Sequence, residues 1–403
     1  MRWLWSRDLR ADGVVRALDG VLRARFLVLG AVLAGWFGYL YSPQVQVGDW
    51  WVFECGARVL TGTAGPRVAV PGGPLHLYEQ MPRLQVGPPA MVAAMPEALL
   101  PPAAGRLLAA GAMVLVLLVC LRLIERLAIA AGADRRRTAA TTLIGGLLAG
   151  HSWSVLAVSF LHLDDVLVLG LLVGALLGLR HARTVWPAVA LGTAAAAKPW
   201  AVAFVCLLLA VPRERRMRAV VVFGTAAAAW WAPFVLAAPD TVGQLGSLDV
   251  LVNPTTLVGA FLGGIPPAAR VVQLVLTVVV GGVLVRRGYW TVAPVAVVAV
   301  RLLTDWQWWP YYGASLVLCA LLVDQLVPVA RGGGPRWRSW PWATTTAVVA
   351  AWAPTWVLDA GGPWTLVAVL RGTLLCLAVA VAVRVATATA GRPLPLVPAL
   401  EEG

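Results

Sequence analysis

Long apolar blocks are the feature that most constrains how this chain can fold. A helix needs roughly 17–25 residues to cross the hydrocarbon core of a bilayer. A soluble protein of 403 residues would interleave polar faces at helical period, and this chain does not. Charged residues make up only 13% of the sequence, against about 25% in soluble domains. The clearest blocks are residues 26–41, 105–121, 166–179, 271–285 and 343–358.

These blocks predict an all-α, polytopic integral membrane protein with a single transmembrane domain over residues 1–403. Arginine clusters between the blocks mark cytoplasmic loops, because such loops are enriched in Lys and Arg. The net charge of +13 therefore comes from arginines in the cytoplasmic loops, and we expect no nucleic-acid partner. The pattern predicts about ten full spans, both termini in the cytoplasm, and a place in the cell membrane. The expected spans are 26–41, 105–124, 138–160, 166–179, 220–237, 270–285, 289–304, 311–329, 341–358 and 363–383.

Several expected elements are not full spans. Residues 42–87 form the first external segment, 88–100 a half-helix bounded by prolines, and 386–403 a cytoplasmic tail. Residues 185–197 and 200–211 are two short apolar pieces joined by Lys198-Pro199, and they are either a re-entrant hairpin or two thin spans. The five cysteines lack metal-ligand spacing, so we expect neither a zinc site nor a disulfide framework.

Carboxylates gather at the predicted external ends of the spans. Many tryptophans lie at the same level, where an interfacial belt explains them. The carboxylates indicate polar chemistry on the outer face. They are Asp49, Glu54, Glu79, Asp164, Asp165, Asp240, Asp249, Asp305 and Asp359.

Asp49 and two tryptophans come before a stretch with an apolar stripe at helical spacing, residues 52–60. This pattern predicts a helix on the membrane surface with Asp49 at its N-cap. Two roles stay open for the carboxylate. It either caps the helix or acts as a general base that takes a proton from a sugar hydroxyl.

The sequence Leu161-His162-Leu163-Asp164-Asp165 lies where two predicted spans meet. Asp164 or Asp165 fits the N-cap of the following helix. The same carboxylates are candidates for orienting a polar substrate with His162. We expect no cofactor. If the chain binds a metal, the candidate is a divalent cation held by Asp164 and Asp165.

Three cations fall inside apolar runs. Lys198 is the single lysine among 32 Lys and Arg residues, and about a dozen apolar residues separate it from each arginine cluster. A charge at such depth is usually functional and needs a counter-charge, water or a ligand. Arg301 and Arg371 need partners for the same reason. Asp305 and Asp359 are candidates for pairing, and a lipid-linked phosphate is the functional alternative.

Several of these motifs together resemble a known family. The opening resembles that of the GT-C polyprenyl-phosphate-sugar-dependent glycosyltransferases, and the run from Gly192 to Lys198-Pro199-Trp200 is similar to a further segment of that family. The nearest resemblance is to glycosyltransferase family 87, the actinobacterial mannosyltransferases. The opening motifs are Asp49 after the first span, Arg58-Val59-Leu60-Thr61-Gly62, Pro74-Leu75-His76-Leu77-Tyr78, Pro88-Pro89-Ala90 and Met95-Pro96.

The resemblance implies a GT-C fold and a defined reaction. Such enzymes pass a sugar, here expected to be mannose, from a polyprenyl-phosphate donor to a lipid or glycan acceptor on the outer face, with inversion. It implies that Asp49 is the catalytic base and that Lys198, Arg301 and Arg371 hold the donor phosphate. The candidates for substrate contact are Trp50, Glu54, His162, Asp164, Asp165, Asp305, Trp308, Tyr311 and Tyr312.

The chain departs from the family pattern at two places. Val86-Gly87 precedes Pro88-Pro89 where the family often has Tyr-Pro-Pro. The late aromatic run, residues 306–312, lacks the family's histidine, so a second polar role falls to Asp305, Tyr311 or Tyr312.

A transporter or flippase for a lipid-linked or anionic substrate is the alternative function. Intramembrane charges and broken helices fit it equally well. The absence of an inverted internal repeat and the long external segment with its carboxylates favour the enzyme.

Overall fold

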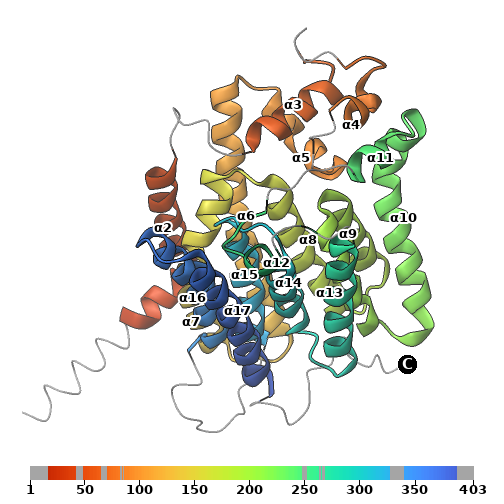
Figure 1. The fold of residues 1–403 in the computed structure, drawn as a ribbon. Coiled ribbons are helices and arrows are strands. Elements are labelled where there is room, and N and C mark those ends of the chain that lie inside the picture. Colours follow the sequence, from red (N-terminus) through yellow and green to blue (C-terminus); the bar gives the residue numbers. More distant parts are fainter. Residues whose placement is uncertain are drawn as a thin grey trace, which may run out of the picture.

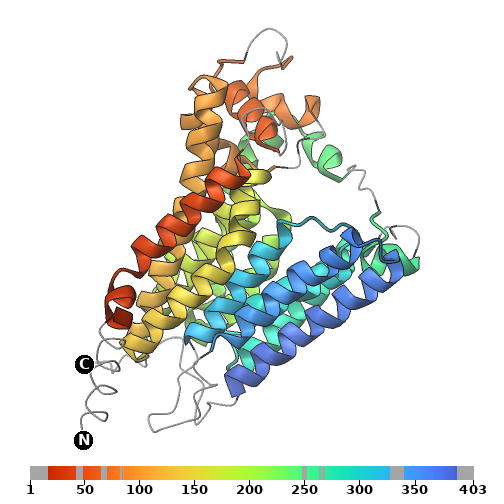
Figure 2. The ribbon, with the colours of Figure 1, turned by 90° about the vertical axis from the view of Figure 1, so that its left-hand side faces the viewer.

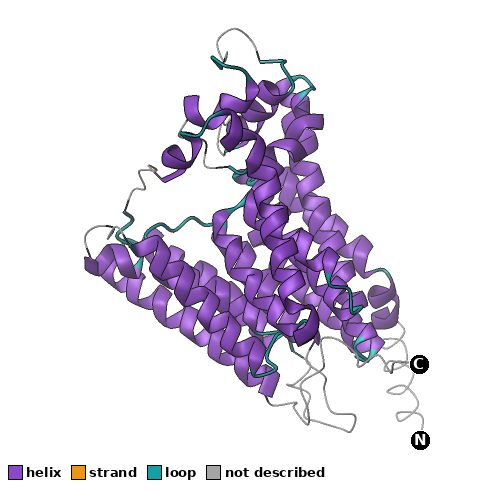
Figure 3. Cartoon of the chain, turned by 90° about the vertical axis from the view of Figure 1, so that its right-hand side faces the viewer, coloured by secondary structure: helices purple, strands orange, loops and turns teal. Residues whose placement is uncertain are grey.

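The computed structural model describes residues 17–387 apart from 42–48, 65–69, 82, 83, 85, 247–251, 263, 264, 266, 267 and 327–339. Every regular element in that part of the chain is a helix (Figure 3). Asp249 and most of the predicted tail, residues 388–403, lie outside the described residues.

The helices follow one another along the chain, and Figure 1 labels the α-helices among them. They are α2 (Arg25–Leu40), α3 (Trp50–Leu60), η2 (Pro74–His76), α4 (Leu77–Gln80), α5 (Pro88–Ala98), α6 (Pro102–Ala130), α7 (Arg135–Ser154), η3 (Val155–Ser159), α8 (Leu163–Arg180), α9 (Val185–Ala197), η4 (Pro199–Ala210), α10 (Arg213–Ala237), α11 (Thr241–Gly246), α12 (Leu257–Leu262), α13 (Ala269–Arg286), α14 (Ala293–Thr304), α15 (Tyr312–Leu326), α16 (Trp342–Asp359) and α17 (Trp364–Thr387).

Five helices in the described chain are long and apolar enough to cross a membrane: α6, α7 continued by η3, α10, α13 and α17. Large apolar side chains such as Leu27 and Leu236 are largely exposed, which water disfavours and hydrocarbon does not. The prediction of a helical membrane protein is therefore confirmed. The count of about ten spans and the GT-C arrangement stay predictions. The shorter apolar helices are α2, α9, η4, α14 and α15.

The helices pack in two groups. In Figure 2, α2 lies along α6 and α7, and it contacts both. Towards the C-terminus, α16 and α17 pack on one another and on α15. The short helices α3, α4 and α5 gather at one end of the molecule, at the top of Figure 1.

The corner between α9 and η4 follows from its sequence. Lys198 has an extended backbone, with φ −147° and ψ 119°. A residue before proline is disfavoured in the helical region, so α9 must end there. Pro199 then opens η4, where its fixed φ suits a first helical position. A residue from another part of the chain also contacts this corner: the Gly87 N–H donates to the Ala197 carbonyl at 3.1 Å.

Candidate functional site

The turn before α8 carries the first part of the site. The π-helix η3 ends α7, and Leu161 follows with a φ of 50°, in the left-handed region that a leucine rarely adopts. Irregular helix turns and such backbone strain cluster at functional sites. The turn places His162 at the N-cap of α8 and both Asp164 and Asp165 in the first turn of that helix, where the helix dipole favours negative charge.

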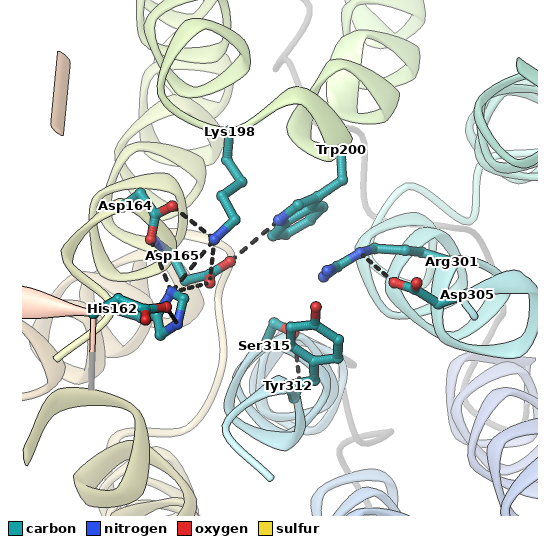
Figure 4. Close-up of polar contacts among 10 residues, drawn as sticks. His162, Asp164, Asp165, Lys198, Trp200, Arg301, Asp305, Tyr312 and Ser315 are labelled. Atoms are coloured by element: carbon teal, nitrogen blue, oxygen red, sulfur yellow. Dashed lines mark hydrogen bonds and ion pairs between the residues drawn. The ribbon is translucent and has the colours of Figure 1, made fainter. Parts of the chain in front are cut away.

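Lys198 reaches this turn from the corner between α9 and η4. Its Nζ lies 2.6 Å from Asp164 Oδ2 and 3.0 Å from Asp165 Oδ2, and all three side chains are mostly buried (Figure 4). Trp200 Nε1 donates to the other oxygen of Asp165, Oδ1, at 3.1 Å. The counter-charge that the sequence demanded for Lys198 is therefore supplied by the protein itself.

Asp49 joins the same group through His162. The distance between Asp49 Oδ2 and His162 Nε2 is 2.7 Å, and the Asp49 backbone N–H donates to the Phe160 carbonyl at 2.9 Å. Asp49 occupies the N-cap position of α3, but its side chain makes no capping hydrogen bond. The Asp49 side chain is 51% exposed and that of His162 only 7%. Asp49 is thus the solvent-accessible end of a chain of buried polar groups.

The pKa values at this end follow from the contacts. The hydrogen bond with His162 lowers the pKa of Asp49 below its ordinary 3.8, helped by the charges of His162 and Lys198 and opposed by burial. Burial and the charge of Lys198 lower the pKa of His162, but its contacts with Asp164 and Asp49 outweigh them and raise it above 6.5 overall. The geometry favours an ionised Asp49 beside a protonated imidazole.

Arg301 forms the second centre of the site. Its guanidinium lies between two aromatic rings, 4.6 Å from the ring centroid of Trp200 and 4.5 Å from that of Tyr312. Its Nε is 3.6 Å from Asp305 Oδ2, and its buried Nη1 has no hydrogen-bond partner among the described residues. Figure 4 shows Arg301 pointing toward the group around Lys198. A buried guanidinium with an unused donor is suited to an anionic ligand.

A pocket of about 290 Å³ borders both centres. Lys198 and Arg301 contribute two of its cations. The residues lining this pocket do not include Asp49. The lining residues are Lys198, Pro199, Trp200, Arg270, Gln273, Leu274, Thr277, Arg301, Asp305, Trp306 and Gln307.

Arg371 lies apart from this pocket. Its Nη1 donates to the Thr255 carbonyl at 2.6 Å and to Thr255 Oγ1 at 2.8 Å, and the guanidinium stacks 4.1 Å from the Trp308 ring centroid. Neither Arg371 nor Trp308 is among the pocket's lining residues. These contacts give both side chains a role in packing α17 against residues 252–257.

The remaining candidates divide in the same way. Tyr311 stacks on the His162 ring with centroids 3.9 Å apart, so it belongs to the site. Glu54 instead pairs with Arg58 one turn along α3, at 3.0 Å. Trp50 is buried beside Phe53, away from the surface position that sugar stacking needs.

His162, Asp164 and Asp165 meet the geometric requirement for a cation site, because one ligand atom from each lies within 4.8 Å of the others. Lys198 bears on this possibility, since its ammonium already contacts both carboxylates. A divalent cation would have to displace that ammonium, so the donor set fits Lys198 better than a metal.

Two residues of the site, Trp200 and Gln273, were not predicted as site residues from the sequence. Trp200 was noted only as part of a motif, yet it links Asp165 to Arg301. Its place directly after the Lys198-Pro199 corner was the available signal. Gln273 lines the pocket and donates to the Arg301 carbonyl at 3.0 Å, and no local pattern marks that contact between α13 and α14.

Comparison with known proteins adds no assignment to this geometry. No protein-family model, curated protein or solved structure matches the chain.

Proposed function

We propose that this chain is a membrane glycosyltransferase that passes a sugar, which we propose to be mannose, from a polyprenyl-phosphate donor to a lipid or glycan acceptor. One observation carries the proposal. An exposed carboxylate, Asp49, is held by His162 at the end of a buried polar chain whose other end, Lys198, lines a cationic pocket with Arg301. Such an arrangement offers a base and an anion site in one connected group.

In the proposed reaction the acceptor oxygen attacks the sugar's anomeric carbon. The acceptor O–H proton goes to the Asp49 carboxylate as the new carbon–oxygen bond forms. The bond between the anomeric carbon and the phosphate oxygen breaks, and the polyprenyl phosphate leaves with that electron pair. One displacement inverts the anomeric centre. His162 holds Asp49 in place and favours its ionised form.

Arg301 is the better candidate for the donor phosphate. Lys198 already has two carboxylate partners, whereas Arg301 Nη1 is buried without a hydrogen-bond partner in the described chain. Guanidinium groups suit phosphate geometry, and negative charge grows on the phosphate as the glycosidic bond breaks. Lys198 then acts mainly by neutralising Asp164 and Asp165, both of which its ammonium contacts.

The transporter alternative draws on the same buried charges. It gives no role to a half-exposed carboxylate oriented by a buried imidazole, and this feature favours the enzyme.

The test is transfer by the purified protein in lipid vesicles, with a panel of radiolabelled polyprenyl-phosphate sugars and membrane acceptors. Asp49→Asn keeps the shape of the side chain but removes the base, so we expect transfer to fall about a hundredfold or more. Glu54→Gln is the matched control, because Glu54 lies on the same helix and pairs with Arg58 instead. Transfer by Asp49→Asn near the wild-type rate would remove Asp49 from the mechanism. Movement of the donor across the bilayer without transfer would support the transporter.

A further inference from the structure

A second pocket lies at the opposite end of the bundle. It measures about 580 Å³ and is formed where residues 17–23, α2, α6 and α7 meet. α7 and η3 run from Arg135 at this pocket to Ser159 near His162, roughly 36 Å at helical rise. Figure 2 shows α2 running from this lower end towards the short helices at the top. The lining residues are Asp19, Leu22, Arg23, Arg25, Arg122, Glu125, Ile129, Arg135, Arg136 and Ala139.

The pocket is strongly cationic. Five arginines line it against two carboxylates. Glu125 is shared, since it pairs with Arg25 and lies 3.4 Å from Arg122 Nη1. Arg136 Nη2 lies 3.0 Å from Asp19 Oδ1.

Two of the arginines carry a charge that no described acidic side chain neutralises. Within the described chain, no acidic side chain pairs with Arg23 or Arg135, and both are exposed. The pocket therefore keeps a positive excess that its own carboxylates do not neutralise, which favours an anionic occupant.

An apolar stripe continues from the pocket along α6. Val119 and Leu115 lie three and seven residues before Arg122, so the three share one helix face. Their exposed fractions are 55% for Val119 and 60% for Leu115. A ligand with a charged head at Arg122 can thus lay a hydrocarbon chain on α6, which a soluble anion cannot exploit.

We propose that this pocket binds the phosphodiester head group of an anionic phospholipid, with an acyl chain along Val119 and Leu115. Basic pockets between membrane helices are suited to such head groups. The arginines supply charge-assisted hydrogen bonds to the phosphate oxygens. The site is separate from Asp49 and from the pocket around Arg301, so it does not depend on the proposed transfer reaction.

The experiment titrates the purified full-length protein, in neutral detergent, with fluorescent phosphatidylglycerol. Phosphatidylcholine and inorganic phosphate serve as competitors. We expect unlabelled phosphatidylglycerol to displace the probe and the other two to fail at equal concentration. The double variant Arg23→Gln, Arg135→Gln should bind about 25-fold more weakly, from about fivefold for each arginine near a lipid phosphate.

The matched control is Arg286→Gln, Arg287→Gln, which removes two exposed arginines at the end of α13, outside the pocket. It should bind the probe as the wild type does. Leu115→Gln with Val119→Gln should weaken the binding of phosphatidylglycerol, because it removes the exposed apolar surface that the acyl chain would cover. Equal losses in both arginine variants would overturn the proposal in favour of general surface charge. Displacement by inorganic phosphate at equal concentration would overturn the lipid as the source.

Discussion

His162 is the residue on which the charge balance of the site depends. Its Nε2 contacts Asp49, and its Nδ1 lies 3.3 Å from Asp164 Oδ1 and 3.5 Å from Asp165 Oδ2. A protonated imidazole can donate to both sides at once, whereas a neutral one can donate to only one. After loss of that proton, the Lys198 ammonium would still contact Asp164 and Asp165, but the imidazole would no longer supply positive charge between these carboxylates and Asp49.

We predict that stability falls as pH rises through the raised pKa of His162, above its ordinary 6.5. A group whose pKa is raised by folding contributes stability below its unfolded pKa and loses it as pH rises through the folded one. The lowered pKa of Asp49 acts oppositely, because its contribution is present above 3.8 and is lost only at more acidic pH. Thermal unfolding measured between pH 5 and 9, with His162→Gln as control, tests this. A variant with the same alkaline loss would show that another group is responsible.

For Lys198, the sequence predicted the need for a partner but not which partner. The sequence required a partner for a single lysine deep in an apolar segment, and the structure provides Asp164 and Asp165. The choice between these carboxylates and a phosphate could not be made from sequence. It depends on how α8 packs against α9, and nothing local in either helix encodes that contact.

At the scale of elements, the corner between α9 and η4 depends on a close approach of α5. Gly87 is the N-cap of α5, and a Cβ built on it would lie 1.8 Å from the Ala196 carbonyl oxygen. Only glycine permits this approach, since the neighbouring atoms are backbone and cannot rotate away. The sequence predicted the half-helix and the break at Pro199. It could not show that the two elements touch.

We predict that Gly87→Ala destabilises the protein by about 1–3 kcal/mol, because α5 must move away from the end of α9. Gly224→Ala in α10 is the matched control. Its added Cβ meets nothing within 4 Å, and alanine is the better helix former by about 0.5–1 kcal/mol. The midpoint of thermal unfolding should therefore fall for the first variant and hold or rise for the second. Equal midpoints would mean that the corner tolerates the displacement.

A buried carboxylate links two further elements. Asp324 in α15 accepts the backbone N–H groups of Ala343 and Thr344 at 3.1 and 2.7 Å, and also the Thr344 hydroxyl at 2.7 Å. It thereby satisfies the free N–H groups at the start of α16. Sequence reasoning passed over Asp324 because it lies within a predicted span and its partners come about 20 residues later.

We predict that Asp324→Ala lowers stability by about 2–3 kcal/mol, since it leaves buried donors at a helix start without an acceptor. Thr346→Val is the control, because the Thr346 hydroxyl only bonds the backbone of its own helix. Chemical unfolding of both variants in the same detergent measures the difference. A loss for Thr346→Val as large as that for Asp324→Ala would contradict the assigned role.

At the scale of the whole molecule, two buried arginines face different parts of the fold. Arg301 of α14 faces the pocket shared with Lys198, and Arg371 of α17 faces residues 252–257. From sequence both were isolated charges in apolar runs, and both were assigned to the donor phosphate. The helical membrane class followed from hydropathy alone. The separation of these two roles did not, because it depends on which face of each helix turns towards its neighbours.

We predict that Arg301→Met changes donor binding and that Arg371→Met changes stability. Arg301→Met removes the unused donor at the pocket and should raise the KM for a polyprenyl-phosphate donor about tenfold or more, with little change in acceptor KM. Arg371→Met breaks two hydrogen bonds to Thr255 and should lower stability by about 2 kcal/mol without changing donor KM. Transfer kinetics and thermal unfolding of the two variants form the test, and each variant controls for the other. A raised donor KM in Arg371→Met alone would reverse the assignment and move the phosphate site to α17.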